Sequence, residues 1–218
     1  MASKAKVGRE KDPDVAKIRA LAPDLVVANI EENRREVVEA LRAAGVPVWV
    51  TFPRTVAQGI GLVRELGDLT GASEAAVGLA DALERRYEAT SRLVAARVRV
   101  RVFCPIWRQP YMTINRDTYV HDMLAVCGGA NVFADRDERY PTVTLEEMAA
   151  RAPEVILLPD EPYRFRRAHL ADFDPFPDLP ARAAGRIHLV DGKLLTWYGA
   201  RIADALERLP ALLAPPVD

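Results

Sequence analysis

Short runs of branched apolar residues alternate with helical patterns along the chain. The first two runs are LVVA at 25–28 and VPVWV at 46–50, and a helix over 13–21 precedes them. Between the runs, residues 33–43 repeat apolar side chains at the spacing of one helical face. Continuous apolar strands are typical of a parallel sheet that is covered on both faces. The pattern therefore predicts a strand–helix–strand unit with a right-handed crossover.

The same pattern occurs a second time in the C-terminal half. An Ala-Pro-acid triplet leads into the strand at 25–28, and another leads into the run VILLP at 155–159. Ala-Ala-Gly precedes VPVWV, and it also precedes RIHLV at 186–190. The extra residues of the second copy fall in DFDPFPDLP, at 172–180. The two matched anchors favour a recurrent α/β unit over a chance match of apolar strings, and two copies are too few for a solenoid.

A long helical pattern lies between the two copies. Residues 73–96 contain no proline and a single glycine, and their apolar side chains recur on one face. At 1.5 Å per residue such a helix is about 36 Å long, roughly the width of a small domain. It either braces two lobes or packs inside one domain. Beyond it, the pattern predicts a strand over 98–106 and helices over 117–127 and 199–213.

These elements together predict an α/β fold made of two Rossmann-like lobes with mainly parallel sheets, joined by one long helix. The predicted N-terminal lobe covers residues 1–72, the interlobe helix 73–97, and the C-terminal lobe 98–218.

Composition and charge exclude several classes of function. The net charge is −1, and the basic clusters RVRVR (97–101) and RFRR (164–167) are typical of solvated surface, so nucleic-acid binding is not expected. No apolar run reaches the roughly 18–20 residues that span a bilayer. The opening residues lack the hydrophobic segment of a secretory signal, so the chain as written is expected in the cytoplasm.

No motif in the chain nominates a catalytic site. Dinucleotide, P-loop and Gly-x-Ser-x-Gly patterns are absent from the sequence, and we expect no enzyme and no cofactor. The three histidines, His121, His169 and His188, are not spaced as zinc ligands usually are. Cys104 and Cys127 form no Cys-x-x-Cys pair, and a disulfide between them stays open. The alternative function is a cytoplasmic enzyme or metal-binding protein that uses His121 or His188.

Aromatic side chains follow the predicted strands at their carboxyl ends. They are Phe52, Trp107, Tyr111, Tyr163, Phe165, Trp197 and Tyr198. Ligands of open α/β folds bind beyond these ends, so the rings predict an apolar-walled cleft. The alternative is that each ring caps the core of its own lobe. Arg54 and Arg108, in the same loops, either meet carboxylate or phosphate groups of a ligand or pair with nearby acids.

Three segments resemble the substrate-binding proteins of ABC importers. They are PIWRQPYMTINRDTYVHDMLAVCGGANVF, RYPTVTLEEMAARAPEVILLPDEPY and WYGARIADALERL. The resemblance is to the class with a rigid interlobe helix, which serves cobalamin, haem and iron-siderophore uptake, and especially to its cobalamin-binding members. It covers nearly all of residues 10–213.

The resemblance implies a class III periplasmic-binding-protein fold and binding without catalysis. It implies a corrinoid, haem or ferric siderophore as ligand in an interlobe cleft, an ABC permease as partner, and a periplasmic or cell-surface location. By position, Trp107, Tyr111, Tyr163 and Trp197 match the ligand-facing loops, and Asn29 stands where a ring is often found. Glu36 lies close to one permease-docking acid, whereas the second would fall near Thr196 and is missing.

The chain departs from the family at its front. Family members normally begin with a signal or lipid anchor and a first strand and helix, whereas this chain begins at the turn before the second helix. We therefore expect a truncated N-terminal lobe with exposed apolar sheet surface or a bare edge strand. A late gene start, a truncated non-transporting paralogue and a second copy that completes the fold are the alternatives.

Overall fold

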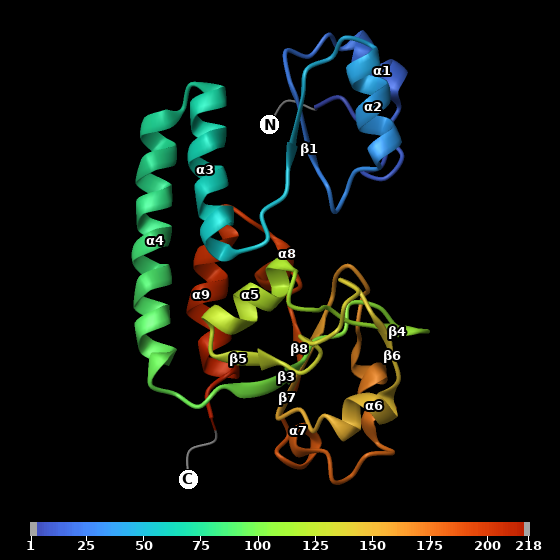
Figure 1. Cartoon of the computed structure of the whole chain (residues 1–218), viewed down its shortest axis with the longest axis vertical. Coiled ribbons are helices and arrows are strands. Elements are labelled where there is room, and N and C mark those ends of the chain that lie inside the picture. Colours follow the sequence, from blue (N-terminus) through green and yellow to red (C-terminus); the bar gives the residue numbers. More distant parts are fainter. Residues whose placement is uncertain (1–3, 216–218) are drawn as a thin grey trace. The chain divides into compact units, whose positions relative to one another are not determined.

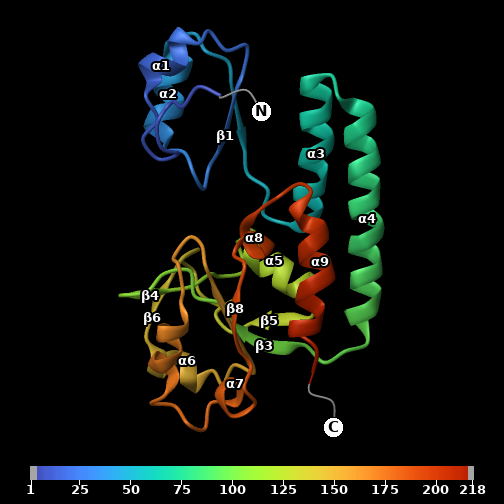
Figure 2. The same ribbon diagram turned by 180° about the vertical axis from the view of Figure 1, so that it is seen from behind.

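The computed structural model describes residues 4–215 and divides the chain into two compact units, Met1–Phe52 and Pro53–Asp218. Both units combine helices with parallel strands, as Figures 1 and 2 show from opposite sides, and the predicted α/β class is confirmed. Within the described residues, no helix is both long and apolar enough to cross a membrane. The predicted lobe boundaries stay a prediction.

The first unit contains the predicted strand–helix–strand arrangement. Strands β1 (Val26–Asn29) and β2 (Val48–Thr51) pair in parallel, and α2 (Arg35–Ala43) connects them. The short helix α1 (Val15–Ala20) precedes β1. Gly45 follows the last residues of α2 with a φ of +76°, which explains why glycine ends this helix. On β1, the apolar side chain of Val27 is 50% exposed.

The second unit is built on a four-stranded parallel sheet. Its order is β5 (Gly129–Asn131), β3 (Val100–Phe103), β7 (Val155–Pro159) and β8 (Ile187–Val190). A separate antiparallel pair joins β4 (Tyr111–Met112) to β6 (Thr142–Val143). Every residue of β7 is buried, as its unbroken apolar sequence predicts for a central parallel strand.

Helices surround this sheet. They are α3 (Val56–Thr70), α4 (Ser73–Ala95), α5 (Tyr119–Val126), α6 (Leu145–Ala150), the 3-10 helix η1 (Arg167–Phe173), α7 (Pro180–Ala183), α8 (Lys193–Thr196) and α9 (Arg201–Leu212). The long helix α4 packs along α3 and also contacts α9 (Figures 1 and 2). All three belong to the second unit. The use of α4 as a brace between lobes stays a prediction.

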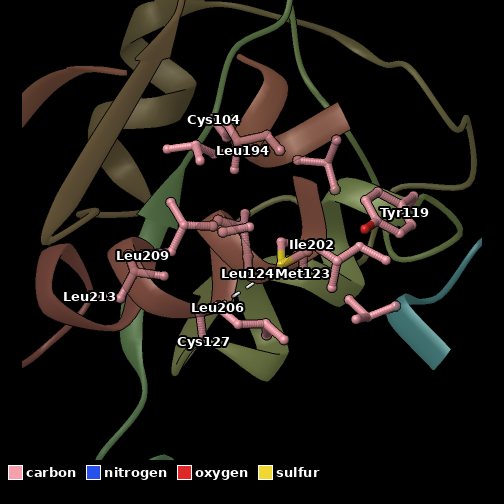
Figure 3. Close-up of a cluster of buried hydrophobic side chains, with 14 of the residues drawn as sticks. Cys104, Tyr119, Met123, Leu124, Cys127, Leu194, Ile202, Leu206, Leu209 and Leu213 are labelled. Carbon is pink, nitrogen blue, oxygen red and sulfur yellow. Dashed lines mark hydrogen bonds between the residues drawn. The ribbon is translucent and has the colours of Figure 1, made fainter. Parts of the chain in front are cut away.

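Two hydrophobic cores lie on opposite faces of the sheet. Val155 and Leu157 of β7 belong to one core, and Ile156 and Leu158 to the other, because successive side chains of a strand point to opposite faces. Figure 3 shows part of the first core: Cys104, Tyr119, Met123, Leu124, Cys127, Leu194, Ile202, Leu206, Leu209 and Leu213. The second core is rich in phenylalanine, and Phe103, Phe133 and Phe173 are fully buried there.

Both cysteines are free thiols in the first core. Burial raises the pKa of Cys104 and of Cys127 to about 12, so the reactive thiolate is scarce at neutral pH. We expect that neither thiol reacts with DTNB at pH 8 in the folded protein and that both react after unfolding in guanidinium chloride. A chain that released no thiol on unfolding without reductant would instead contain a disulfide.

Candidate ligand-binding site

Four aromatic side chains gather beyond the carboxyl ends of β3 and β7. The ring of Trp107 meets that of Tyr163 edge-on, with centroids 5.5 Å apart. Tyr163 in turn lies 4.8 Å from Phe165, and Phe165 stacks on Tyr111 at 6.3 Å. We call these four rings the aromatic cluster. Aromatic pairs in such arrangements add about 0.5–1.5 kcal/mol each beyond the area that they bury.

Backbone pairing positions the first half of the aromatic cluster. The amide nitrogen of Met112 donates to the carbonyl oxygen of Trp107 at 3.2 Å, which closes the loop 107–112 into a hairpin. Tyr111 then enters β4, where it pairs with Val143 of β6. Trp107 closes the base of this hairpin with Met112, and 45% of its surface is exposed.

Asp172 of η1 fixes this hairpin from the other side. The guanidinium of Arg108 donates twice to its carboxylate, at 2.6 Å from Nε and 2.9 Å from Nη2. The hydroxyl of Tyr111 donates to the same carboxylate. The carboxylate links η1 to β4 and to the loop before β4. Asp172 is 64 residues from Arg108 and 61 residues from Tyr111 in the sequence. Of the two open interpretations of Arg108, pairing with a nearby acid is the one that the structure shows.

The charges of this link are well defined at neutral pH. The Arg108 guanidinium lowers the pKa of Asp172, so the carboxylate stays ionised. Burial, followed by the bond to Asp172, raises the pKa of Tyr111, so its hydroxyl stays protonated and remains a donor. The aromatic cluster therefore lies beside a neutralised ion pair.

The other predicted residues of the second unit are Trp197, Tyr198 and Arg54. Trp197 follows α8 and is 49% exposed, and Lys193 lies over its ring at 5.7 Å. Tyr198 packs on Tyr119 at 4.7 Å, next to the first core. The guanidinium of Arg54 donates to Asp117 at 2.7 Å. Among the described residues, no ring–ring contact joins Trp197 to the aromatic cluster.

Three predicted residues belong to the first unit. The side-chain oxygen of Asn29 accepts from the amide of Glu31 at 2.8 Å, and its amide nitrogen donates to Thr51 at 3.3 Å, so Asn29 shapes the loop after β1. Phe52 is half-buried at the end of this unit. Glu36 is exposed in the first turn of α2. Their roles toward a ligand or a permease stay predictions.

The histidines are dispersed over the second unit. His121 is half-buried in α5 and His188 lies in β8, and burial lowers the pKa of both. His169 lies beside the aromatic cluster, 5.7 Å from Tyr163 and 5.9 Å from Phe165, and its Nδ1 accepts from the amide of Arg166. Between residues 4 and 215, no three His, Cys, Asp or Glu side chains are grouped so as to hold a metal ion.

The sequence did not indicate His169 or Asp172 as neighbours of the rings. Both lie near or within the Pro-, Phe- and Asp-rich insertion of the second strand–helix–strand copy. An insertion that directly follows the aromatic loop of a strand end is the signal that could have pointed to them.

Comparisons with known proteins agree with this fold. The family profile of periplasmic binding proteins matches residues 1–194. The vitamin B12-binding protein of Salmonella typhimurium is 32% identical over 145 residues, which are 66% of this chain and 54% of that protein. The chain thus spans about half the length of the curated relatives that it matches.

Solved structures show the same fold. The periplasmic vitamin B12 binding protein of Vibrio cholerae superposes with a TM-score of 0.83 at 21% identity, over 94% of this chain and 80% of that one. The periplasmic heme-binding protein BhuT, solved in complex with two hemes, gives a TM-score of 0.80 at 26% identity, over 96% and 83%. The resemblance found in the sequence is confirmed, and the chain belongs to the periplasmic binding protein family.

Proposed function

We propose that the chain is the solute-binding component of an ABC importer and that its ligand is a corrinoid, a haem or a ferric siderophore. The observation that carries the proposal is the aromatic cluster, with Trp107 45% exposed. The exposed ring of Trp107 and the half-buried ring of Tyr163 suit a large, flat, partly apolar ligand, whereas Phe165 is buried in the second core. Relatives named as vitamin B12-binding and heme-binding proteins support the same class of ligand.

The way in which the aromatic cluster is held supports a binding role. Asp172 neutralises Arg108 and restrains Tyr111, so the loop 107–112 is fixed before a ligand arrives. Preorganisation of this kind lowers the entropy cost of binding. Trp107 and Tyr163 then supply apolar contact area. The proposed contributions of Trp197, Phe52, Arg54, Arg108 and Asn29 are polar and aromatic contacts around the same ligand.

Delivery to a permease is the second part of the proposal, with the protein in the periplasm or at the cell surface. Glu36 is exposed on α2, close to the position at which the family resemblance implies a docking acid. At the second expected position, the hydroxyl of Thr196 donates to Glu161 at 3.2 Å. A carboxylate therefore lies next to the position where the sequence lacks one, and we include Glu161 in the proposed docking surface.

Thermal unfolding with ligand present tests the ligand class. We expect cyanocobalamin or haemin at about 100 times its Kd to add about 2.7 kcal/mol to the free energy of unfolding. For a chain of this size that is a rise in Tm of roughly 5–10 °C. Trp107→Ala should weaken the affinity for that ligand by about tenfold, because an aromatic anchor typically contributes 1–3 kcal/mol.

The matched control is Leu93→Ala, which shortens an apolar side chain that is 53% exposed on α4. It should leave the ligand-induced rise in Tm unchanged. The proposed ligand class is wrong if cyanocobalamin, haemin and a panel of ferric siderophores all leave the Tm of the unmodified protein unchanged.

A further inference from the structure

A groove of about 370 Å³ runs along the outer edge of β8, and its lining includes none of the four rings of the aromatic cluster. Strand β8 is the last strand of its sheet, so one of its edges pairs with no other strand of residues 4–215. The 3-10 helix η1 flanks this edge on one side and α9 on the other. The main side chains of the walls are Arg167, Leu170, Leu189, Leu194, Arg208 and Leu212. We call this feature the β8 groove.

The backbone of β8 presents free hydrogen-bonding groups to the groove. The carbonyl oxygens of Arg186 and Val190 accept bonds from Ile156 and Asp160, on the β7 side. Because residues of a parallel strand alternate in direction, the N–H and C=O groups of Ile187 and Leu189 point to the open edge. Leu189 is also 44% exposed. An open edge of this kind is a template for one more strand.

The β8 groove carries positive charge that is not neutralised within the described part of the chain. Arg167 and Arg208 line opposite sides, and neither guanidinium has a hydrogen bond or ion pair with another described residue. Nearby arginines behave differently, because Arg182 pairs with Asp174 at 3.3 Å and Arg201 with Asp204 at 3.1 Å.

The other titratable groups of the groove leave this charge in place. Burial, together with the neighbouring Arg186, lowers the pKa of His188, so that imidazole is neutral at pH 7. Asp191 is the acid in the lining, and its Oδ1 accepts from the backbone amide of Lys193. The two guanidinium groups therefore outnumber the single carboxylate.

We propose that the β8 groove binds an extended acidic peptide segment of a partner protein, which adds a strand to β8. Main-chain bonds to Ile187 and Leu189 supply affinity, and pockets for alternate side chains supply selectivity, as in other cases of strand addition. Apolar side chains of the peptide contact Leu170 and Leu212, and acidic ones meet the two arginines. A second copy of this chain fits less well, because its β8 edge would bring the same arginines face to face.

The test uses blocked decapeptides in which valine and glutamate alternate, with fluorescence anisotropy as the readout and the whole chain as the receptor. A second peptide has lysine in place of glutamate, and a third is N-methylated at alternate residues to remove strand hydrogen bonds. We expect the acidic peptide to bind and both others to bind at least tenfold more weakly. Absent binding of the acidic peptide, or equal binding of either counterpart, would overturn the proposal.

Two sets of variants locate the binding site. Arg167→Glu with Arg208→Glu should weaken binding of the acidic peptide at least tenfold, whereas Arg19→Glu with Arg85→Glu makes the same change in net charge elsewhere and should not. Leu189→Pro removes one outward N–H and leaves the ladder to β7 intact, so it should weaken binding at least fivefold relative to Leu189→Ala. Equal affinities within either comparison would overturn the proposal, as would a dimer that Leu189→Pro dissociates.

Discussion

Replacing Asp172 with alanine is expected to lower the free energy of unfolding by about 2–3 kcal/mol. The side chains of Arg108 and Asp172 are only 22% and 18% exposed, so the variant leaves a largely buried guanidinium without its carboxylate. The hydroxyl of Tyr111 loses its acceptor in the same change. Urea denaturation at pH 7 measures the effect, and ligand binding should weaken with it because the loop 107–112 loses its anchor.

The control for this variant lies two residues further along the chain. Asp174 also pairs with an arginine, but its side chain is 67% exposed, so Asp174→Ala should cost less than about 1 kcal/mol. Asp172→Asn keeps the shape of the side chain and removes its charge. Its loss in the free energy of unfolding should lie between those of the two alanine variants. An Asp172→Ala variant as stable as Asp174→Ala would contradict the proposed restraint.

The cost of Asp172→Ala should also depend on pH. Arg108 lowers the folded-state pKa of Asp172 below the unfolded value of about 3.9. The unfolded chain therefore binds the proton first as the pH falls, and the stabilising contribution is present above that value and is lost as the pH falls through the folded pKa. The difference between the unmodified protein and the variant should be constant from pH 6 to 8 and shrink below pH 4.

Replacing Gly67 with alanine is expected to destabilise the protein, although alanine favours helices. A Cβ at this position of α3 would lie 2.1 Å from the Cβ of Ala76 in α4. The two helices pack along each other, so they would have to separate. Overpacking of this kind costs about 1–3 kcal/mol, which exceeds the gain in helix propensity of about 1 kcal/mol.

Gly61 and Gly78 provide matched controls within the same pair of helices. A Cβ on either would meet no atom within 4 Å. Gly61→Ala and Gly78→Ala should therefore each raise the free energy of unfolding by about 0.5–1 kcal/mol. Thermal and urea denaturation should show a lower free energy of unfolding for Gly67→Ala and a higher one for the two control variants. A stabilising Gly67→Ala would show that α3 and α4 are not in close contact there.

Elements with a regular hydrophobic period could be predicted from the sequence. The helix expected over 73–96 is observed as Ser73–Ala95, and that expected over 33–43 is observed as Arg35–Ala43. Thr144 caps the start of α6, since its hydroxyl accepts from the amide of Glu147 at 3.1 Å. In these segments the apolar stripe and the capping residue indicate the same helix. The local preference for a helix therefore coincides with the packing of the folded chain.

Helix α3 was not predicted, and the physical reason lies in its glycines. Gly59, Gly61 and Gly67 interrupt the apolar stripe of Val56–Thr70 and lower its helix propensity. The close approach of α4 at Gly67 supplies the stability that propensity does not. The strand expected over 98–106 is also shorter, Val100–Phe103, because the carbonyl of Cys104 accepts from Thr113 instead of extending the ladder.

The rings of the site could be predicted, but their partners could not. Strand ends identify Trp107, Tyr111 and Tyr163 as neighbours because strand ends share one edge of a parallel sheet. Asp172 comes from a long insertion without a hydrophobic period, so only the folded chain shows that it meets Arg108. Trp197 was expected at a strand end as well, but α8 separates it from β8, and its ring contacts Lys193 and no ring of the aromatic cluster in the described chain.

The alternation of side chains along β7 has a consequence for how the second unit unfolds. One strand supplies Val155 and Leu157 to one core and Ile156 and Leu158 to the other. If β7 detaches from the sheet, both cores lose buried side chains at the same time. The two faces are therefore thermodynamically coupled and lose their protection from solvent together. A shift of β7 by a single residue would exchange the contents of the two layers at once, so its register is specified twice.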